Sequence, residues 1–233
     1  RDADVTGVQT CALPISCFDS HYKTIGHLVV MDDKPMLDEK RTLSILKIFA
    51  ARAGAELERK RTESVMRDMA YHDALTGLPN RILLNDRLER ALLQAQRNNS
   101  LVGLLYIDFD RFKQINDTLG HGVGDELLKS VGNRLKECLR QQDTVARLGG
   151  DEFILLLPEI SNEEDAGKLA NKLLDKIRPS FQIGQHEIII TLSIGIALYP
   201  QDAGDAKSLI KCSDEALYLA KNNGRDCYQF FKQ

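Results

Sequence analysis

Two acidic residues stand at a sharp reversal of the chain. Residues 147–158 read RLGGDEFILLLP, so Asp151 and Glu152 follow two glycines, Gly149 and Gly150, and precede a run of apolar residues. Such a run is typical of a strand that is buried on both faces. Glycine tolerates the backbone angles that a tight turn between two strands needs. A third acid, Asp108, ends the apolar stretch LVGLLYID. The pattern places carboxylates at the ends of buried strands.

These acids could do metal-assisted phosphoryl chemistry. If the two strands are neighbours, Asp108 and Asp151 meet at one end of the sheet. Mg²⁺ takes oxygen ligands and is commonly held by one or two carboxylates together with substrate phosphates. Two such ions clamp the attacking and the leaving oxygen in a phosphoryl displacement, and glycines let a nucleotide approach the backbone. The spacing alone leaves open the alternative that the acids are solvated turn residues.

The elements that position the acids follow from hydrophobic periodicity over residues 73–233. Strands alternate with helices around one central hairpin, which predicts an α/β chain folded as a ferredoxin-like α+β sandwich, a mostly antiparallel sheet covered by helices. A capping-box spacing from Ser161 to Glu164 opens one helix. In chain order we expect a helix over 80–99, a strand over 101–110, an irregular connection over 113–125, a helix carrying Leu127, Val131 and Leu135, strands 144–148 and 153–158 around a turn at 149–152, a helix over 162–177, a hairpin over 181–190, a strand over 191–200, a helix over 205–223 and an edge strand over 227–231.

The N-terminal part has a different character. Residues 5–16 show no clear helical or strand period, and no charged n-region of a signal peptide precedes them. Back-translated, this stretch matches one reading frame of a common sequencing adapter, so we interpret residues 1–16 as non-native. A strand over His27–Met31, an acidic turn and one long helix to about residue 72 follow. This helix becomes charge-rich at ELERKRTES, residues 56–64, where it is either a solvated face of an ordinary helix or part of a signalling linker or a short coiled coil.

Composition narrows the function classes. The chain has 233 residues, of which 43% are hydrophobic and 28% are charged, with a net charge of −3. Because backbone binding needs concentrated positive charge, no nucleic-acid partner is expected. No stretch reaches the roughly 20 apolar residues of a membrane span. The cysteines show neither paired nor metal-ligand spacing, which predicts reduced thiols of a cytoplasmic protein: Cys11, Cys17, Cys138, Cys212 and Cys227.

The literal residues of five stretches are more specific than their spacing. In order along residues 73–225 they are DALTGLPNR, DFDRFKQINDTLGHGVGDELL, RLGGDEF, SIGIA and DEALYLAKNNGR. Together they resemble the GGDEF family, the diguanylate cyclases, which join two GTP molecules into cyclic di-GMP and release two pyrophosphates. The strand, turn and helix over 17–60 resemble the last third of a GAF domain. The resemblance therefore implies a truncated GAF part, a linker helix over 61–72 and a GGDEF domain over 73–233.

The resemblance implies roles for individual residues. Asp108, the main-chain carbonyl of Phe109 and Asp151 match ligands of Mg²⁺, two ions per site, with Mn²⁺ able to replace it. Asp151 also matches the proposed general base, and Glu152 the second acid of the signature. The remaining substrate contacts fall into four groups: Asn116 and Asp125 match contacts to guanine; His121 matches a further substrate contact; Lys113, Lys221 and Arg225 match cations near the phosphates; Gly149 and Gly150 match the glycines of the turn.

Each of these residues also has a purely structural interpretation. Cations such as Lys221 and Arg225 are favoured at a helix C-terminus by the dipole. His121 fits an ordinary loop histidine, and Asn116 and Asp125 fit a turn and a helix N-cap. Without the resemblance, the residue types leave both interpretations open.

Regulation and assembly are implied in the same way. Arg140 and Asp143 form an R-x-x-D pattern that resembles the family's inhibitory site for its own product. Because each domain of this family holds one GTP, a homodimer is expected for catalysis. Two other functions remain as alternatives: a catalytically silent module that binds GTP or cyclic di-GMP, and a cyclase with a different nucleotide preference.

Overall fold

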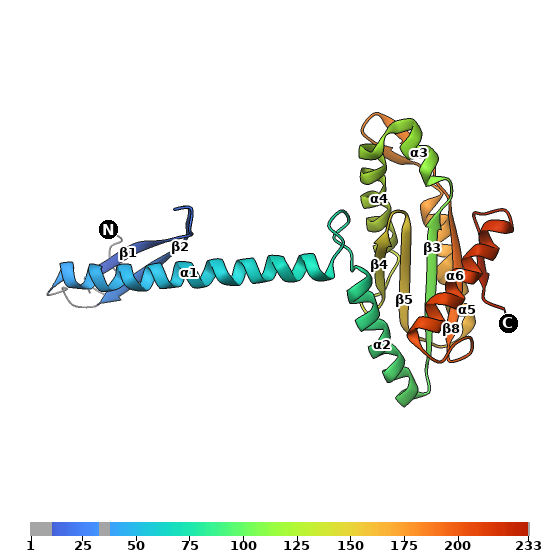
Figure 1. The fold of residues 1–233 in the computed structure, drawn as a ribbon, viewed down its shortest axis with the longest axis horizontal. Coiled ribbons are helices and arrows are strands. Elements are labelled where there is room, and N and C mark those ends of the chain that lie inside the picture. Colours follow the sequence, from blue (N-terminus) through green and yellow to red (C-terminus); the bar gives the residue numbers. More distant parts are fainter. Residues whose placement is uncertain (1–10, 33–37, 233) are drawn as a thin grey trace, which may run out of the picture. The chain divides into compact units, whose positions relative to one another are not determined.

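The computed structural model describes residues 11–32 and 38–232, which divide into two compact units, Arg1–Asp68 and Met69–Gln233. In the first unit, strand β1 (Cys11–Phe18) pairs antiparallel with β2 (Thr24–Asp32), and helix α1 (Glu39–Tyr71) begins there (Figure 1). Leu46 and Ala50 of α1 are buried. A Cβ at Gly54 would lie 2.4 Å from the Phe18 carbonyl oxygen, so this turn of α1 requires glycine.

One expectation about the first unit changes. Residues 11–16 belong to β1, so our prediction that this stretch forms no regular element is wrong for them. Pairing with β2 uses backbone groups and therefore needs no apolar periodicity in β1. Residues 1–10 and most of the expected acidic turn, 33–37, lie outside the described residues. The strand expected over His27–Met31 is confirmed as part of β2.

The second unit is built on a five-stranded sheet. Its order is β4-β5-β3-β8-β9, and all neighbours are antiparallel except the parallel pair β8 and β9 (Figure 1). The strands are β3 (Leu101–Phe109), β4 (Thr144–Gly149), β5 (Glu152–Ile160), β8 (Leu192–Tyr199) and β9 (Tyr228–Phe230). A separate hairpin consists of β6 (Phe181–Ile183) and β7 (His186–Ile188). The predicted ferredoxin-like α+β fold is confirmed.

Helices bury both faces of this sheet. On one face, Leu104 and Tyr106 of β3 pack with helices α2 (Arg81–Asn98) and α6 (Ala206–Asn222). On the other face, Leu105 and Ile107 pack with α4 (His121–Lys136) and α5 (Glu163–Ile177). Because successive side chains of a strand point to opposite faces, β3 is apolar throughout and its first polar carboxylate comes at its end, Asp108.

Gly195 sets how closely α6 approaches the sheet. A Cβ at this position in β8 would lie 2.0 Å from the Ser213 carbonyl oxygen. The glycine of SIGIA is therefore required for close helix packing on the sheet.

Three sequence expectations about the second unit are corrected. The connection over 113–125 is mostly helical, because α3 (Phe112–Leu119) and the first turn of α4 occupy it and only Gly120, with φ 87°, separates them. The hairpin turn is shorter than expected, because Gly149 still pairs with Glu152. The cap of α5 is Asn162 rather than Ser161, and its side chain accepts from the Asp165 N–H.

Two further properties concern the described part of the chain. Within residues 11–32 and 38–232, no helix combines the length and apolar character needed to cross a bilayer. Four cysteines there are free thiols: Cys17, Cys138, Cys212 and Cys227.

Candidate active site

The predicted meeting of acids at the end of β3 is confirmed by strand register. Asp108 of β3 lies directly opposite Glu152 of β5, next to the turn that carries Asp151. Opposite residues in an antiparallel pair have Cβ atoms about 4.5–5.5 Å apart. The Lys221 ammonium, in the last turn of α6, lies 2.8 Å from Asp108 Oδ1. Carboxylates from two distant segments and one cation thus share this end of the sheet.

The site has a surplus of negative charge. Burial raises the pKa of Asp108 above its ordinary value, and the charges of Asp151 and Glu152 raise it further, while Lys221 opposes them. Burial likewise raises the pKa of the Tyr106 phenol, with Glu152 and Asp214 contributing in the same direction. Lys221 therefore opposes the repulsion between these acids, and burial is the main reason that the pKa of Asp108 stays raised.

This donor set fits a divalent cation. Carboxylate and carbonyl oxygens are hard ligands, and the raised pKa of Asp108 reflects the burial of a carboxylate whose charge a cation would stabilise. Within the described residues, no three His, Cys, Asp or Glu side chains converge to hold a metal by themselves. A cation at Asp108 and Asp151 would therefore draw further ligands from the main chain, water or a bound phosphate.

The turn that carries Asp151 is held by Arg147. Its Nε and Nη2 donate to the Gly150 carbonyl oxygen at 2.9 and 2.8 Å, and its Nη1 lies 2.8 Å from Asp73 Oδ1. The Arg147 side chain is only 9% exposed. Gly149 and Gly150 have φ angles of 144° and 53°, as expected for glycines in such a turn. Arg147 therefore ties the acidic turn to the loop that begins at Asp73.

Sequence reasoning missed Arg147 and Asp73 as parts of the site. Their place in the sequence could have indicated this, because Arg147 belongs to the motif RLGGDEF and Asp73 to the motif DALTGLPNR. Burial works to raise the pKa of Asp73, but hydrogen bonds from Thr76 and Arg147 outweigh it and hold the pKa below its ordinary value. Asp73 is thus kept ionised as the partner of Arg147.

The candidate guanine-binding residues lie where α3 faces α4. The Oδ1 atom of Asn116 is buried without a hydrogen-bond partner among the described residues. A Cβ at Gly124 would lie 1.9 Å from this oxygen, so glycine is what lets Asn116 sit against α4. Asp125 follows directly inside α4 and is exposed, and His121 is the exposed first residue of that helix. The loop and N-cap interpretations of His121 and Asp125 are therefore wrong.

The candidate phosphate-binding cations come from three places. Lys113 is exposed in the first turn of α3, Lys221 lies on α6, and Arg225 follows the end of α6 with φ 64°. The residue before α3, Arg111, has φ 61°, and no side chain caps this helix. N–H groups at a helix start attract anions.

The predicted inhibitory residues form a surface turn between α4 and β4. The Arg140 N–H donates to Asp143 Oδ2 at 2.9 Å, and the Asp143 N–H donates to the Arg140 carbonyl oxygen at 3.1 Å. The Arg140 side chain is exposed. The two residues are therefore presented together beside the sheet.

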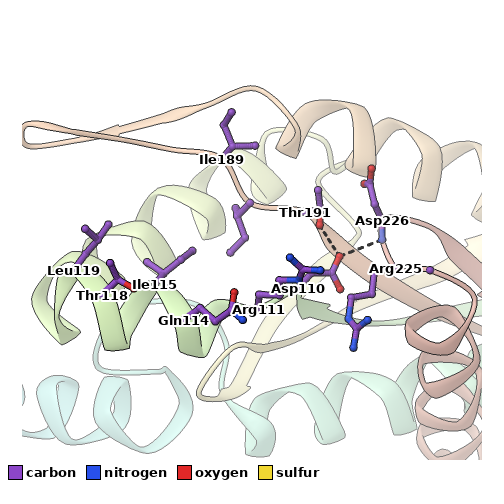
Figure 2. A pocket seen from close by; sticks show the side chains of 12 residues that line it. Asp110, Arg111, Gln114, Ile115, Thr118, Leu119, Ile189, Thr191, Arg225 and Asp226 are labelled. Atoms are coloured by element: carbon purple, nitrogen blue, oxygen red, sulfur yellow. Dashed lines mark hydrogen bonds between the residues drawn. The ribbon is translucent and has the colours of Figure 1, made fainter.

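A pocket of about 480 Å³ lies on the side of α3 that carries Ile115 and Leu119 (Figure 2). Of the predicted site residues it includes Arg225, which Figure 2 shows near Asp110. Asp110 is 8% exposed and accepts hydrogen bonds from Thr191, Ser193 and the Asp226 N–H. Sequence reasoning assigned Asp110 no role, although it lies in the quoted stretch DFDRFKQINDTLGHGVGDELL.

The fold and the site define a ferredoxin-like α+β domain with an acidic cluster where β3 and the β4–β5 turn meet. Residues 70–227 match the protein family that is described as "Diguanylate cyclase, GGDEF domain". The chain belongs to this family.

Relatives and solved structures agree with this assignment. MucR of Pseudomonas aeruginosa, named a bifunctional diguanylate cyclase/cyclic di-GMP phosphodiesterase, is 47% identical over 194 residues, 83% of this chain and 27% of MucR. The diguanylate cyclase TpbB of the same species is 42% identical over 157 residues, 67% of this chain and 36% of TpbB. This chain therefore spans only 27% and 36% of these two relatives.

Two solved structures share the fold. The GGDEF domain of Pseudomonas aeruginosa TpbB has a TM-score of 0.68 at 40% identity and covers 69% of this chain and 94% of its own. The coiled coil and GGDEF domain of DgcB from Caulobacter crescentus, in complex with c-di-GMP, has a TM-score of 0.70 at 28% identity and covers 79% and 98%.

Proposed function

We propose that this domain is a diguanylate cyclase, a nucleotidyltransferase that condenses two GTP into cyclic di-GMP with release of two pyrophosphates. The observation that carries the proposal is the pairing of Asp108 with Glu152 across β3 and β5, beside Asp151 and 2.8 Å from Lys221. An acidic cluster with a surplus of negative charge and a nearby cation suits a metal-dependent reaction on a triphosphate.

The residues divide the work by chemistry. Asp108, the Phe109 carbonyl and Asp151 would hold Mg²⁺, two ions per site, or Mn²⁺ in its place. When bound, the metal would supply Lewis-acid stabilisation of phosphate charge. Asp151 would accept the proton of the attacking ribose 3′-hydroxyl, whose oxygen forms the new bond to the α-phosphorus as pyrophosphate leaves. Glu152, the second acid of the signature, would add its negative charge to that of Asp151 and so support the metal site.

Recognition of GTP falls to α3, α4 and α6. Asn116 and Asp125 carry an amide and a carboxylate that can pair with the guanine edge, and His121 adds a contact at the start of α4. Lys113, Lys221 and Arg225 would neutralise the triphosphate, with the N–H groups at the start of α3. Gly149 and Gly150 would let the nucleotide approach the turn.

Mg²⁺-dependent turnover of GTP by residues 17–233, with chromatographic identification of the product, tests the proposal. The parent should form cyclic di-GMP, and Asp151→Ala should form none. Asp86→Ala, which removes an exposed acid on α2, is the matched control and should keep parental activity. If the parent binds neither GTP nor cyclic di-GMP, the proposal is wrong.

A silent module that binds GTP or cyclic di-GMP is the second candidate. The observation in its favour is that PdeR of Escherichia coli, which is named a cyclic di-GMP phosphodiesterase and not a cyclase, is 37% identical over 185 residues. Binding of GTP without turnover, even in dimers forced by an added coiled coil, would favour this candidate. A product other than cyclic di-GMP from ATP would favour a cyclase of different specificity.

Regulation by product is part of the proposal. Arg140 and Asp143 would bind cyclic di-GMP, because arginine can make paired hydrogen bonds to phosphate and a carboxylate accepts from guanine. Arg140→Ala should raise the concentration of cyclic di-GMP that halves the activity by at least about tenfold. Unchanged inhibition would remove this site from the proposal.

The N-terminal part carries two further proposals. Residues 17–60 would be the end of a GAF domain, and residues 1–16 would be non-native, although residues 11–16 pair in β1. Resequencing the source locus decides the second proposal, because a native reading frame running through residue 16 contradicts it. We propose the cytoplasm as the compartment, since the substrate GTP is held there.

A further inference from the structure

We propose that Asp110 is a positioning residue for nucleotide binding: it holds the left-handed turn at Arg225 and Asp226 against the end of β3 and so places Arg225 at the pocket beside α3. The inference rests on the proposed function, because it concerns the cation assigned to the triphosphate. It adds a role for a carboxylate that is neither a metal ligand nor a proton acceptor in that proposal.

Asp110 joins three segments that are far apart in sequence. It follows β3 directly, and its own N–H donates to the Thr191 carbonyl oxygen at 2.9 Å. Its Oδ2 accepts from Thr191 Oγ1 at 2.7 Å and from the Asp226 N–H at 3.1 Å, and its Oδ1 accepts from Ser193 Oγ at 2.7 Å. Figure 2 shows Asp110 between Thr191 and Asp226. One carboxylate thus connects the ends of β3 and β8 to the segment after α6.

The segment after α6 needs such a connection. Arg225 and Asp226 both have positive φ, 64° and 46°. A non-glycine residue in this region costs free energy and persists only where surrounding contacts hold it. The Arg225 N–H donates to the Ala220 carbonyl oxygen at 3.2 Å, the Asp226 N–H donates to Asp110, and the Asp226 carboxylate pairs with Arg178 Nε at 3.1 Å. The bond from the Asp226 N–H ties this turn to the end of β3, and the carbonyl oxygen of the next residue, Cys227, accepts from the Ile194 N–H of β8 at 3.0 Å.

Burial and the kind of donor make Asp110 suitable for this work. The residue is 8% exposed, and its donors are two hydroxyl groups and one backbone N–H, all neutral. A buried carboxylate accepts several hydrogen bonds at once in a fixed geometry. Arg225 is itself exposed and lines the pocket, so its guanidinium is free for an anion while its backbone is held.

The test compares steady-state kinetics of Asp110→Ala, Arg225→Ala and the double variant with Mg²⁺ and GTP. Asp110→Ala should raise KM for GTP by about tenfold with a small change in kcat, because one hydrogen bond that places a charged group is lost. If Asp110 acts through Arg225, the double variant should be no worse than Arg225→Ala alone. Multiplying effects, or an unchanged KM, would overturn the inference.

A matched control separates positioning from general stability. Asp202→Ala removes another partly buried carboxylate, whose Oδ2 accepts from the Leu198 N–H at 2.7 Å at the opposite end of β8. It should lower the melting temperature and leave KM for GTP unchanged. Asp110→Asn keeps the side-chain shape and one acceptor oxygen, so its KM for GTP should lie close to that of the parent. This variant replaces the alanine variant in the test if the alanine variant does not fold.

A readout without nucleotide keeps the two proposals apart. Hydrogen exchange of residues 224–227 should be at least about tenfold faster in Asp110→Ala than in the parent, because the Asp226 N–H loses its acceptor. Unchanged exchange overturns the inference whatever the activity. A parent that makes no cyclic di-GMP and binds no GTP overturns the proposed function instead.

Discussion

Asp108 lies among the acids of the candidate site, yet its burial disfavours the ionised form of its side chain. Its side chain is 16% exposed, burial raises its pKa, and Asp151 and Glu152 raise it further against the effect of Lys221. An ionised Asp108 therefore costs the folded state free energy, and under the proposed function a divalent cation bound at this end of the sheet would stabilise that charge.

The pH dependence of stability tests this conflict. Because the folded pKa of Asp108 is raised, its favourable contribution is present below the ordinary aspartate range and is lost as pH rises through the folded value. In urea unfolding with EDTA, Asp108→Asn should therefore be more stable than the parent at pH 8 and no different at pH 3. Its cyclase activity should fall by at least about 100-fold.

Asp86→Asn on the exposed face of α2 is the control and should show no such pH-dependent gain. An Asp108→Asn variant less stable than the parent at pH 8 would show that the Lys221 pair outweighs the repulsion.

Asn116 offers a second test at the scale of single atoms. Gly124→Ala would place a Cβ 1.9 Å from Asn116 Oδ1, so the amide must move. We expect KM for GTP to rise by about tenfold or more, because a displaced side chain loses its hydrogen bonds to the base. Gly122→Ala is the matched control, since nothing lies within 4 Å of its added Cβ. Equal KM values for the two alanine variants would contradict a role for Asn116.

At the scale of elements, the acidic turn is positioned from outside its own hairpin. The β4–β5 turn is fixed by Arg147, whose guanidinium also reaches Asp73 in the loop between α1 and α2. That loop is tied to β4 again by the Arg147 N–H, which donates to the Pro79 carbonyl oxygen at 2.9 Å. A change in the loop after α1 is therefore transmitted directly to the turn that carries Asp151.

Arg147→Ala tests this connection. It leaves Asp73 and the Gly150 carbonyl without their buried partner, and removing one member of a buried ion pair costs about 3–5 kcal/mol. Urea unfolding should show a loss in free energy of unfolding of that size. Lys168→Ala breaks only exposed pairs on α5 and should change it by less than about 0.5 kcal/mol. A loss below 1 kcal/mol for Arg147→Ala would mean that the turn does not depend on this contact.

At the scale of the whole molecule, the chain joins the GGDEF unit to a helix that begins in another unit. α1 runs from Glu39 to Tyr71, while the second unit begins at Met69. Exposed apolar side chains continue along α1, including Leu57, Val65 and Met69. These exposed apolar side chains could pack against the same helix of a second copy of the chain. The proposed reaction of two GTP molecules requires that two copies meet.

Dilution tests this dependence on assembly. If two domains must meet, specific activity should fall as the protein is diluted. The protein of residues 69–233 lacks most of α1. Its specific activity should start to fall at a protein concentration at least about tenfold higher than that of residues 17–233. Initial rates across a dilution series measure both. A constant specific activity in both proteins would contradict the homodimer.

Much of this protein follows from the sequence alone. The strand and helix pattern, the position of Asp108 at the end of a strand and that of Asp151 in a turn are local consequences of apolar periodicity and of glycines at a reversal. That these two acids meet depends on β3 and β5 becoming neighbours. The errors were also local: the start of α4, the cap of α5 and the strand over residues 11–16. There, backbone pairing and helix packing outweighed the turn preferences of Asn, Asp, Gly and His.

Only the tertiary structure decided which side chains hold the site in place. Arg147 and Asp73 are 74 residues apart, and Asp110 and Asp226 are 116 apart. No local period relates such partners, because their contact depends on which strands become neighbours and on how α6 ends beside β3. Likewise, the fit of Asn116 against Gly124 exists only once α3 and α4 have packed. Sequence determines which residues can do chemistry, and long-range packing determines how they are aimed.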